Sequence, residues 1–241
     1  MTRFERVIRA LVIEEDMTLT PDNLYIIPNA TVITEGTTVT VEPGTNIQFW
    51  SDDPSDPYAD SYIAKLSVKG AFLVKGTKEN PVNIYPSDLM NRYFVDITED
   101  GKGFISLKYA DITNLATNSD QTHISYADHC TFNFNLGSLF RYRYLESGKV
   151  TESDLYGTYL PYFDLVKDSV FYKIGLIHKP TLRANAQRCI FADCGISYDY
   201  YNFTSENCVF LGNTFVDQTN PNHIVNSSMH ISEDEVMMIL D

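Results

Sequence analysis

A short pattern returns along this chain about every 20 residues: a small residue, one variable residue, then a large apolar residue. Its clearest copies are Cys189-Ile190-Phe191 and Cys208-Val209-Phe210. The small residues of the copies are Ala110, Cys130, Ser153, Ser169, Cys189, Cys208 and Ser227, which gives intervals of 20, 23, 16, 20, 19 and 19 residues. A period near 20 in a chain rich in Val, Ile, Phe and Tyr is typical of a solenoid.

The spacing within each copy indicates what kind of solenoid this is. Residues two apart on a strand share a face, so the small and the large residue both point into one interior. Successive copies then stack as parallel strands about 4.8 Å apart. The leucine and asparagine framework of a leucine-rich repeat is absent from the sequence. We therefore predict an all-β, right-handed, single-stranded parallel β-helix of roughly nine to eleven coils.

The N-terminal half carries short predicted strands separated by Pro, Gly and Asn turns, among them Thr38–Val41, Asn46–Trp50 and Ala64–Val68. Thr38–Phe49 reads TVTVEPGTNIQF, Leu66–Thr77 reads LSVKGAFLVKGT, and Asn80–Ile84 reads NPVNI. These stretches resemble the opening coils of pectin-lyase-like right-handed β-helix proteins, found on Bacteroidetes-type bacterial surfaces, among secreted proteins and in some phage structural proteins. Lys75 departs from the small residue usual before Gly-Thr in that pattern. The resemblance implies the fold and says little about chemistry.

Three segments follow from these patterns. Residues 1–20 are predicted to be an N-terminal cap or lead-in, because an uncovered coil would expose unpaired strand edges. Residues 21–231 are predicted to form the β-helix. In residues 232–241, Ser232 precedes three acidic residues, which favours a short C-terminal capping helix or a linker to further chain.

The acidic composition of the chain limits the kinds of partner that it can bind. The net charge of −14 and the isoelectric point near 4.6 argue against nucleic acid and against anionic membrane surfaces. No apolar run approaches the roughly 18 residues of a membrane span, and the N-terminus does not resemble a signal peptide. We expect either a virion part assembled in the cytoplasm or a domain of an extracellular or cell-surface protein. Structural subunits, including copies of this chain, are the expected partners.

The four cysteines are predicted to be buried free thiols. Cys130, Cys189 and Cys208 occupy the small inward position of the repeat, where a thiol packs as a compact apolar group. A disulfide between Cys189 and Cys208 is the alternative, because the two lie in adjacent predicted coils. Metal-binding CxxC spacing is absent from the sequence, and no cofactor is expected.

An acidic segment with two prolines interrupts the N-terminal coils. Its carboxylates, Asp52, Asp53, Asp56 and Asp60, are candidate Ca²⁺ ligands because calcium prefers oxygen donors. Their spacing differs from an EF-hand loop, and the prolines restrict how the side chains converge. We expect a solvated loop that projects from the solenoid and binds no metal tightly.

A tyrosine cluster is the candidate carbohydrate site. Tyr198, Tyr200 and Tyr201 alternate with Asp and Asn, and outward aromatic rings beside such polar groups can stack on and hydrogen-bond to sugars. The alternative is that these rings pack under longer turns or against a partner subunit.

The residue before each small position is predicted to point outward, and this column contains the only catalytic candidates. Glu152 and Asp168 would lie on adjacent coils about 5 Å apart, close to the carboxylate spacing of a retaining glycosidase, with Arg188 able to bind an acidic sugar. A charge-compensated solvent face explains the same residues. Zinc, Walker, GxSxG and dinucleotide motifs are absent from the sequence. We therefore predict a non-enzymatic structural or adhesive module with glycan contact; the alternative is a carbohydrate-active lyase or glycoside hydrolase.

Overall fold

The fold was analysed in a computed structural model whose described residues are all strands and turns. It describes residues 4–7, 12–28, 30–50, 64–87, 93–97, 103–116, 125–134, 141–146, 149–152, 162–172, 183–196, 204–211, 215–216, 224–225 and 228–229.

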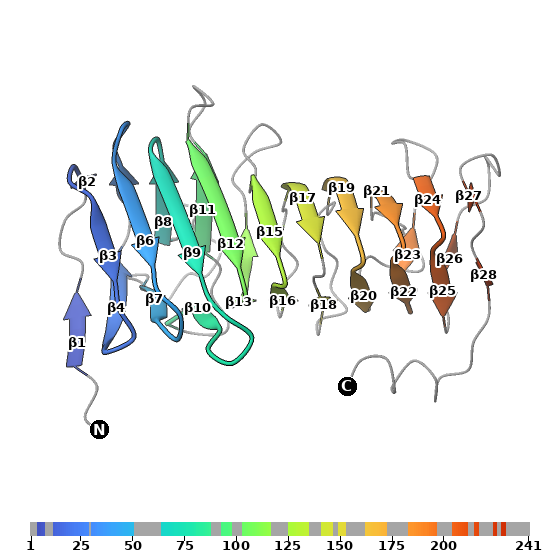
Figure 1. The fold of residues 1–241 in the computed structure, drawn as a ribbon, viewed down its shortest axis with the longest axis horizontal. Helices are drawn as coiled ribbons and strands as arrows, with labels where there is room; N and C mark the ends of the chain where they lie inside the picture. The colour runs from blue at the N-terminus through green and yellow to red at the C-terminus, as the bar shows by residue number, and fades with distance from the viewer. Residues whose placement is uncertain are drawn as a thin grey trace, which may run out of the picture.

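An eleven-stranded parallel sheet, sheet A, extends along the whole molecule, and each rung of the solenoid contributes one strand to it (Figure 1). In spatial order its strands are β1 (Phe4–Val7), β4 (Asn23–Pro28), β7 (Asn46–Trp50), β10 (Val82–Pro86), β13 (Ala110–Thr113), β16 (Thr131–Phe134), β18 (Lys149–Glu152), β20 (Val170–Tyr172), β22 (Ile190–Ala192), β25 (Val209–Leu211) and β28 (Ser228–Met229). The eleven strands fall within the predicted number of coils.

A ten-stranded parallel sheet, sheet C, forms the second side of the solenoid and precedes sheet A in each rung. Its strands are β3 (Met17–Leu19), β6 (Thr38–Val41), β9 (Ala71–Lys75), β12 (Phe104–Lys108), β15 (Tyr126–Asp128), β17 (Arg141–Glu146), β19 (Tyr162–Lys167), β21 (Arg183–Gln187), β24 (Thr204–Glu206) and β27 (Ile224–Val225).

A third side closes the rungs. It consists of a five-stranded sheet B, formed by β2 (Val12–Ile13), β5 (Ala30–Ile33), β8 (Ala64–Val68), β11 (Tyr93–Ile97) and β14 (Leu115–Ala116), and of a separate pair, β23 (Gly195–Ile196) and β26 (Phe215–Val216). Every strand pair is parallel, and consecutive strands belong to different sheets. The predicted fold, an all-β parallel β-helix, is confirmed.

The repeat pattern places the core as predicted. Phe171, Phe191 and Phe210 are paired in register on adjacent strands of sheet A, and all three are buried. Their rings stack with centroids 4.9 Å and 5.5 Å apart. One core cluster contains these rings together with inward residues of the N-terminal rungs. Because each ring contacts the next, every rung completes the hydrophobic interior of its neighbour.

The predicted N-terminal lead-in is itself the first rung. Strands β1, β2 and β3 are the terminal strands of sheets A, B and C. Ile13 and Leu19 are buried members of the common core. Residues 232–241, where a C-terminal helix or linker was predicted, lie outside the described residues.

Candidate functional site

The corner between sheets C and A is a column of left-handed turn residues. At five rungs a single non-glycine residue with φ between 45° and 53° changes the chain direction before the small inward residue. These corner residues are Tyr109, His129, Asp168, Arg188 and Asn207. Each is exposed or half-buried, as predicted for the outward column. We call this column the corner column.

The small residue after four of these turns also has a polar role; the fifth is Ala110. The thiol of Cys189 donates to the Gln187 carbonyl at 3.3 Å, and the hydroxyl of Ser169 donates to the Lys167 carbonyl at 2.6 Å. Cys130 and Cys208 make the same contact two residues back, with Asp128 and Glu206. At these four turns the side chain supplies a donor for a carbonyl near the end of the preceding sheet C strand, which explains why Ser can replace Cys at this position.

One polar cluster in the corner column joins two adjacent rungs. The imidazole Nδ1 of His129 is bonded to the Asp128 carboxylate, and Lys108 Nζ lies 3.8 Å from the same carboxylate. The rings of Tyr109 and His129 stack with centroids 4.5 Å apart. Lys108 Nζ also lies 5.9 Å from the centre of the Tyr109 ring. These four side chains therefore bind one another across the rungs.

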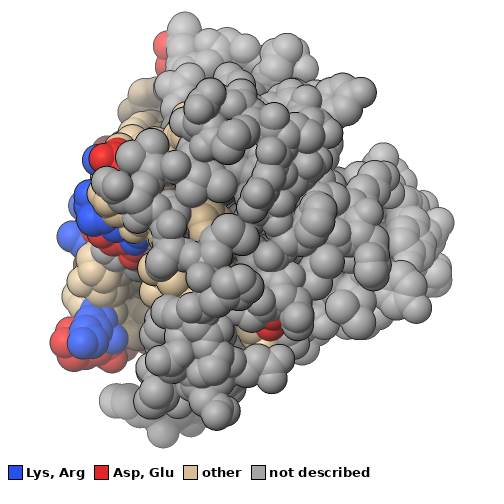
Figure 2. All heavy atoms as spheres, turned by 90° about the vertical axis from the view of Figure 1, so that its right-hand side faces the viewer, with Lys and Arg blue, Asp and Glu red and all other residues tan. Residues whose placement is uncertain are grey.

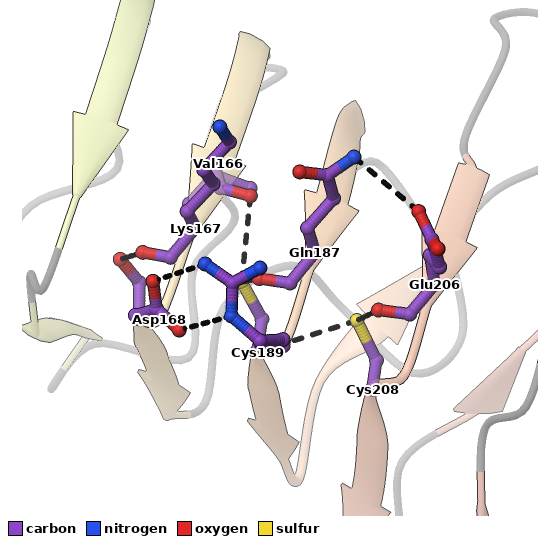
Figure 3. Close-up of polar contacts among 9 residues, drawn as sticks. Val166, Lys167, Asp168, Gln187, Cys189, Glu206 and Cys208 are labelled. Atoms are coloured by element: carbon purple, nitrogen blue, oxygen red, sulfur yellow. Dashed lines mark hydrogen bonds and ion pairs between the residues drawn. The ribbon is translucent and has the colours of Figure 1, made fainter.

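A second cluster lies further along the column (Figure 3). Arg188 Nε and Nη2 donate to the two carboxylate oxygens of Asp168, each at 2.6 Å. One strand position earlier, Gln187 Nε2 donates to Glu206 at 3.3 Å. The hydrogen bonds from Arg188 lower the pKa of Asp168 below its ordinary value, so this carboxyl is ionised at neutral pH.

The cysteines are buried free thiols, as predicted. The backbone N–H of Cys189 donates to the sulfur of Cys208 at 3.4 Å, which confirms that these residues lie in adjacent rungs (Figure 3). Burial raises the pKa of Cys130 to about 12. The contact with the Cys208 sulfur and burial raise the pKa of Cys189. Both are protonated at neutral pH and unsuited to nucleophilic chemistry or metal binding.

The predicted alignment of Glu152 beside Asp168 is wrong. Strand β18 pairs with β20 so that Lys149 faces Val170, whereas the predicted register would place Asp154 there. Glu152 follows Lys149 by three positions and Asp168 precedes Val170 by two, so the two acidic residues are five positions apart along adjacent rungs. In β16 the partner of Glu152 is Phe134.

The sequence contains a second match to the repeat pattern in this rung, with more even spacing. Gly148 lies two residues before Val150, and counting it as the small residue changes the intervals from 23 and 16 to 18 and 21. The more even spacing would have identified the register. The left-handed corner was also missed, although His, Asp and Asn recur in the column and tolerate positive φ better than most residues.

The other predicted sites lie outside the described residues: the Ca²⁺ candidates Asp52, Asp53, Asp56 and Asp60, and the carbohydrate candidates Tyr198, Tyr200 and Tyr201. Within the described part of the chain, no group of three or more His, Cys, Asp or Glu side chains is arranged to hold a metal ion. In the same residues, no helix is long and apolar enough to cross a membrane.

Comparison of the chain with models of protein families, with curated proteins and with solved structures gave no match. The resemblance to pectin-lyase-like β-helix proteins stays a prediction from the sequence.

Proposed function

We propose that this chain is a non-enzymatic structural module, a rigid rod within a cell-surface or virion assembly that also contacts glycans. The observation that carries the proposal is the main core cluster, which includes residues from Ile13 in the first rung to Phe210 in β25. Rungs that share one core cannot bend independently, because each supplies part of its neighbour's interior. Such a rod is suited to holding other domains or subunits at a fixed spacing.

The corner column supports the same role. The bidentate bond between Arg188 and Asp168 ties two rungs together at the surface. A retaining glycosidase needs two carboxyl groups about 5 to 5.5 Å apart, one of which serves as the acid. Asp168 is ionised and engaged by Arg188, and Glu152 is five positions away along the rungs. These contacts favour a structural face over a lyase or hydrolase site.

Glycan contact is proposed for the tyrosine cluster Tyr198, Tyr200 and Tyr201 on sequence grounds alone. Replacement of the three tyrosines by alanine is expected to abolish polysaccharide binding, measured with immobilised polysaccharides, without lowering the thermal midpoint by more than about 3 °C.

The decisive experiment is incubation of the full chain with neutral, acidic and basic polysaccharides, followed by assay of reducing ends and unsaturated products. We expect no product. Cleavage by the wild type that is lost in Glu152→Gln but retained in Glu79→Gln, an exposed carboxylate between β9 and β10, would establish the enzymatic alternative.

A further inference from the structure

A second hydrophobic cluster lies on the outer face of sheet A, separate from the core between the sheets. Side chains alternate along a strand, so the residues on either side of the inward Phe in β20, β22 and β25 point outward. Strand pairing aligns them in two rows, which we call the outer patch: Val170, Ile190 and Val209 in the first row, and Tyr172, Ala192 and Leu211 in the second. Five of these six side chains form the second cluster.

The outer patch is bordered by polar residues along both rows. In the three preceding strands, β13, β16 and β18, the same rows contain only Asp111, Thr113, Thr131, Asn133, Lys149 and Thr151. Beyond β25 the first row continues with Ser228. The charged side chains of the described residues gather mainly along the left side of the molecule in Figure 2, and none of them occupies a position of the patch. The patch is therefore a bounded apolar surface.

Two side chains of the outer patch are buried although they face away from the main core. Leu211 is 1% exposed and Ala192 is 0% exposed. The two lie side by side, and an alanine is too short to cover a leucine from the side. Thr113, in the same row of β13, keeps partial exposure. Because this burial is found in a single chain, another part of the same chain covers this end of the patch.

The sequence order of the strands indicates which part of the chain supplies this cover. Among the described residues, the second cluster contains only side chains of sheet A. Segments 173–182, 197–203 and 217–223 each lead into a strand of sheet C, so both of their ends are fixed by the rung that they close. Residues 230–241 follow β28, the neighbour of β25 in sheet A, and lead to no further described strand. They are the best placed to cross the outer face of sheet A.

The sequence of this segment suits the position. Val236–Leu240 reads VMMIL, five apolar residues between Glu235 and Asp241. Three strands spaced about 4.8 Å apart make a patch about 14 Å long, and five extended residues cover about 17 Å. Val236 follows Met229 by seven positions, enough for about 23 Å of extended chain. The path from β28 to a layer about 10 Å above β22 is about 14 Å, so the apolar residues can reach the patch.

We propose that Val236–Leu240 packs across the outer patch of sheet A as an intramolecular cover. Attachment to β28 gives the segment an effective concentration on the order of millimolar over the patch, which favours it over a second copy or another protein. The cover removes from water an apolar surface that would otherwise promote association. It does not depend on the structural role or the glycan contact proposed above.

Cysteine labelling of the full chain tests the cover. Ala192→Cys adds only a sulfur atom at the buried outward position, and Thr113→Cys is the matched control in the same row. The four native thiols are buried and give little background. The thiol introduced by Ala192→Cys is expected to react with a maleimide at least about tenfold more slowly than the thiol introduced by Thr113→Cys, because it reacts only when the cover opens.

A second set of variants changes the cover itself. Replacing all five residues of Val236–Leu240 by serine is expected to raise the labelling rate of Ala192→Cys at least about tenfold and to change that of Thr113→Cys less than about twofold. Glu233→Gln, Asp234→Asn and Glu235→Gln together alter the same segment but retain its apolar residues, so they should leave position 192 protected. Val209→Cys provides a second probe within the patch. Circular dichroism and thermal midpoints establish that every variant is folded.

The proposal is overturned if Ala192→Cys reacts as fast as Thr113→Cys in the otherwise unchanged chain. Protection that persists after the serine replacement also overturns it and assigns the cover to a segment between strands. Protection that weakens on dilution would instead identify a second copy as the cover. These outcomes are separate from those of the polysaccharide assay: a chain that cleaves polysaccharide and still protects position 192 loses the structural role and keeps the cover.

Discussion

Arg188 binds both carboxylate oxygens of Asp168 although the two residues are twenty positions apart in the chain. They occupy the same corner of adjacent rungs and share the left-handed conformation, with φ of 52° and 48°. Because the repeat is about 20 residues long, residues that are about 20 positions apart in the chain lie side by side in adjacent rungs. The hydrogen bonds from Gln187 to Glu206 and from Thr204 to Asn185 also join residues 19 positions apart, so variants in one rung act on the next.

Replacing Asp168 by Asn is expected to remove a pH-dependent contribution to stability. Arg188 lowers the pKa of Asp168 in the folded chain, so this contribution is present above about pH 4, the ordinary range for Asp, and is lost as pH falls through the lowered pKa. The pair is partly exposed, so the loss at pH 7 should not exceed about 1 kcal/mol. Urea unfolding of both proteins between pH 7 and pH 2 tests this; a difference that grows on acidification would contradict it.

Replacing Phe191 by Ala is expected to lower the free energy of unfolding by about 3 to 5 kcal/mol. The ring is fully buried between Phe171 and Phe210, so its removal leaves a cavity in the middle of the stack. Phe191→Leu, which retains most of the volume, should cost less than the alanine variant. Urea unfolding monitored by circular dichroism measures both, and an alanine cost below about 1 kcal/mol would contradict the packing described.

The corner conformation predicts a residue preference that can be measured. Asn207 has φ of 53°, which a β-branched side chain adopts only with strain. Asn207→Val is expected to destabilise the fold by about 1 to 2 kcal/mol, whereas Asn207→Gly should change stability by less than about 0.5 kcal/mol. Glu206→Val, at the preceding exposed strand position, is the matched control and should be tolerated. Equal costs for Val at both positions would show that the corner is not left-handed.

The thiols are expected to be unreactive in the native protein. Burial holds the pKa of Cys130 at about 12, and all four sulfurs are buried, so they are shielded from reagents at pH 7 to 8. Contact with Cys189 lowers the pKa of Cys208, so the protection of Cys208 depends on its burial. A colorimetric thiol reagent should detect fewer than one thiol per native chain and four in denaturant. Four thiols in denaturant without reductant would also show that Cys189 and Cys208 are not joined by a disulfide.

Much of the fold was predictable because the repeat encodes it directly. The alternation of small and large residues identified the inward face, and three predicted strands, Thr38–Val41, Asn46–Trp50 and Ala64–Val68, have the bounds found in the structure. Packing in a solenoid depends on local periodicity, which a single sequence contains.

The corner column was only partly predictable. Its outward direction follows from the alternation of side chains along a strand. The positive φ of Tyr109 and Arg188 could not be predicted from residue type, because Tyr and Arg rarely adopt positive φ. The predicted register at Glu152 was wrong for a different reason: in the sequence, both Ser153 with Leu155 and Gly148 with Val150 match the small and large pair of the repeat, and strand pairing places Val150 beside Phe171. The sequence pattern alone does not distinguish these two matches, whereas the pairing of β18 with β20 does.

The uniform corner also bears on how a chain of this kind can change its length. Successive turns at Asp168, Arg188 and Asn207 differ in φ by only a few degrees, so the 19 residues from Arg188 to Glu206 begin and end in the same geometry. Tandem duplication of that segment would add one rung and leave both junctions unchanged, whereas inserting a single residue within a strand would turn the rest of that strand inside out. Evolution, or an engineer, can thus extend this rod in whole increments of about 4.8 Å.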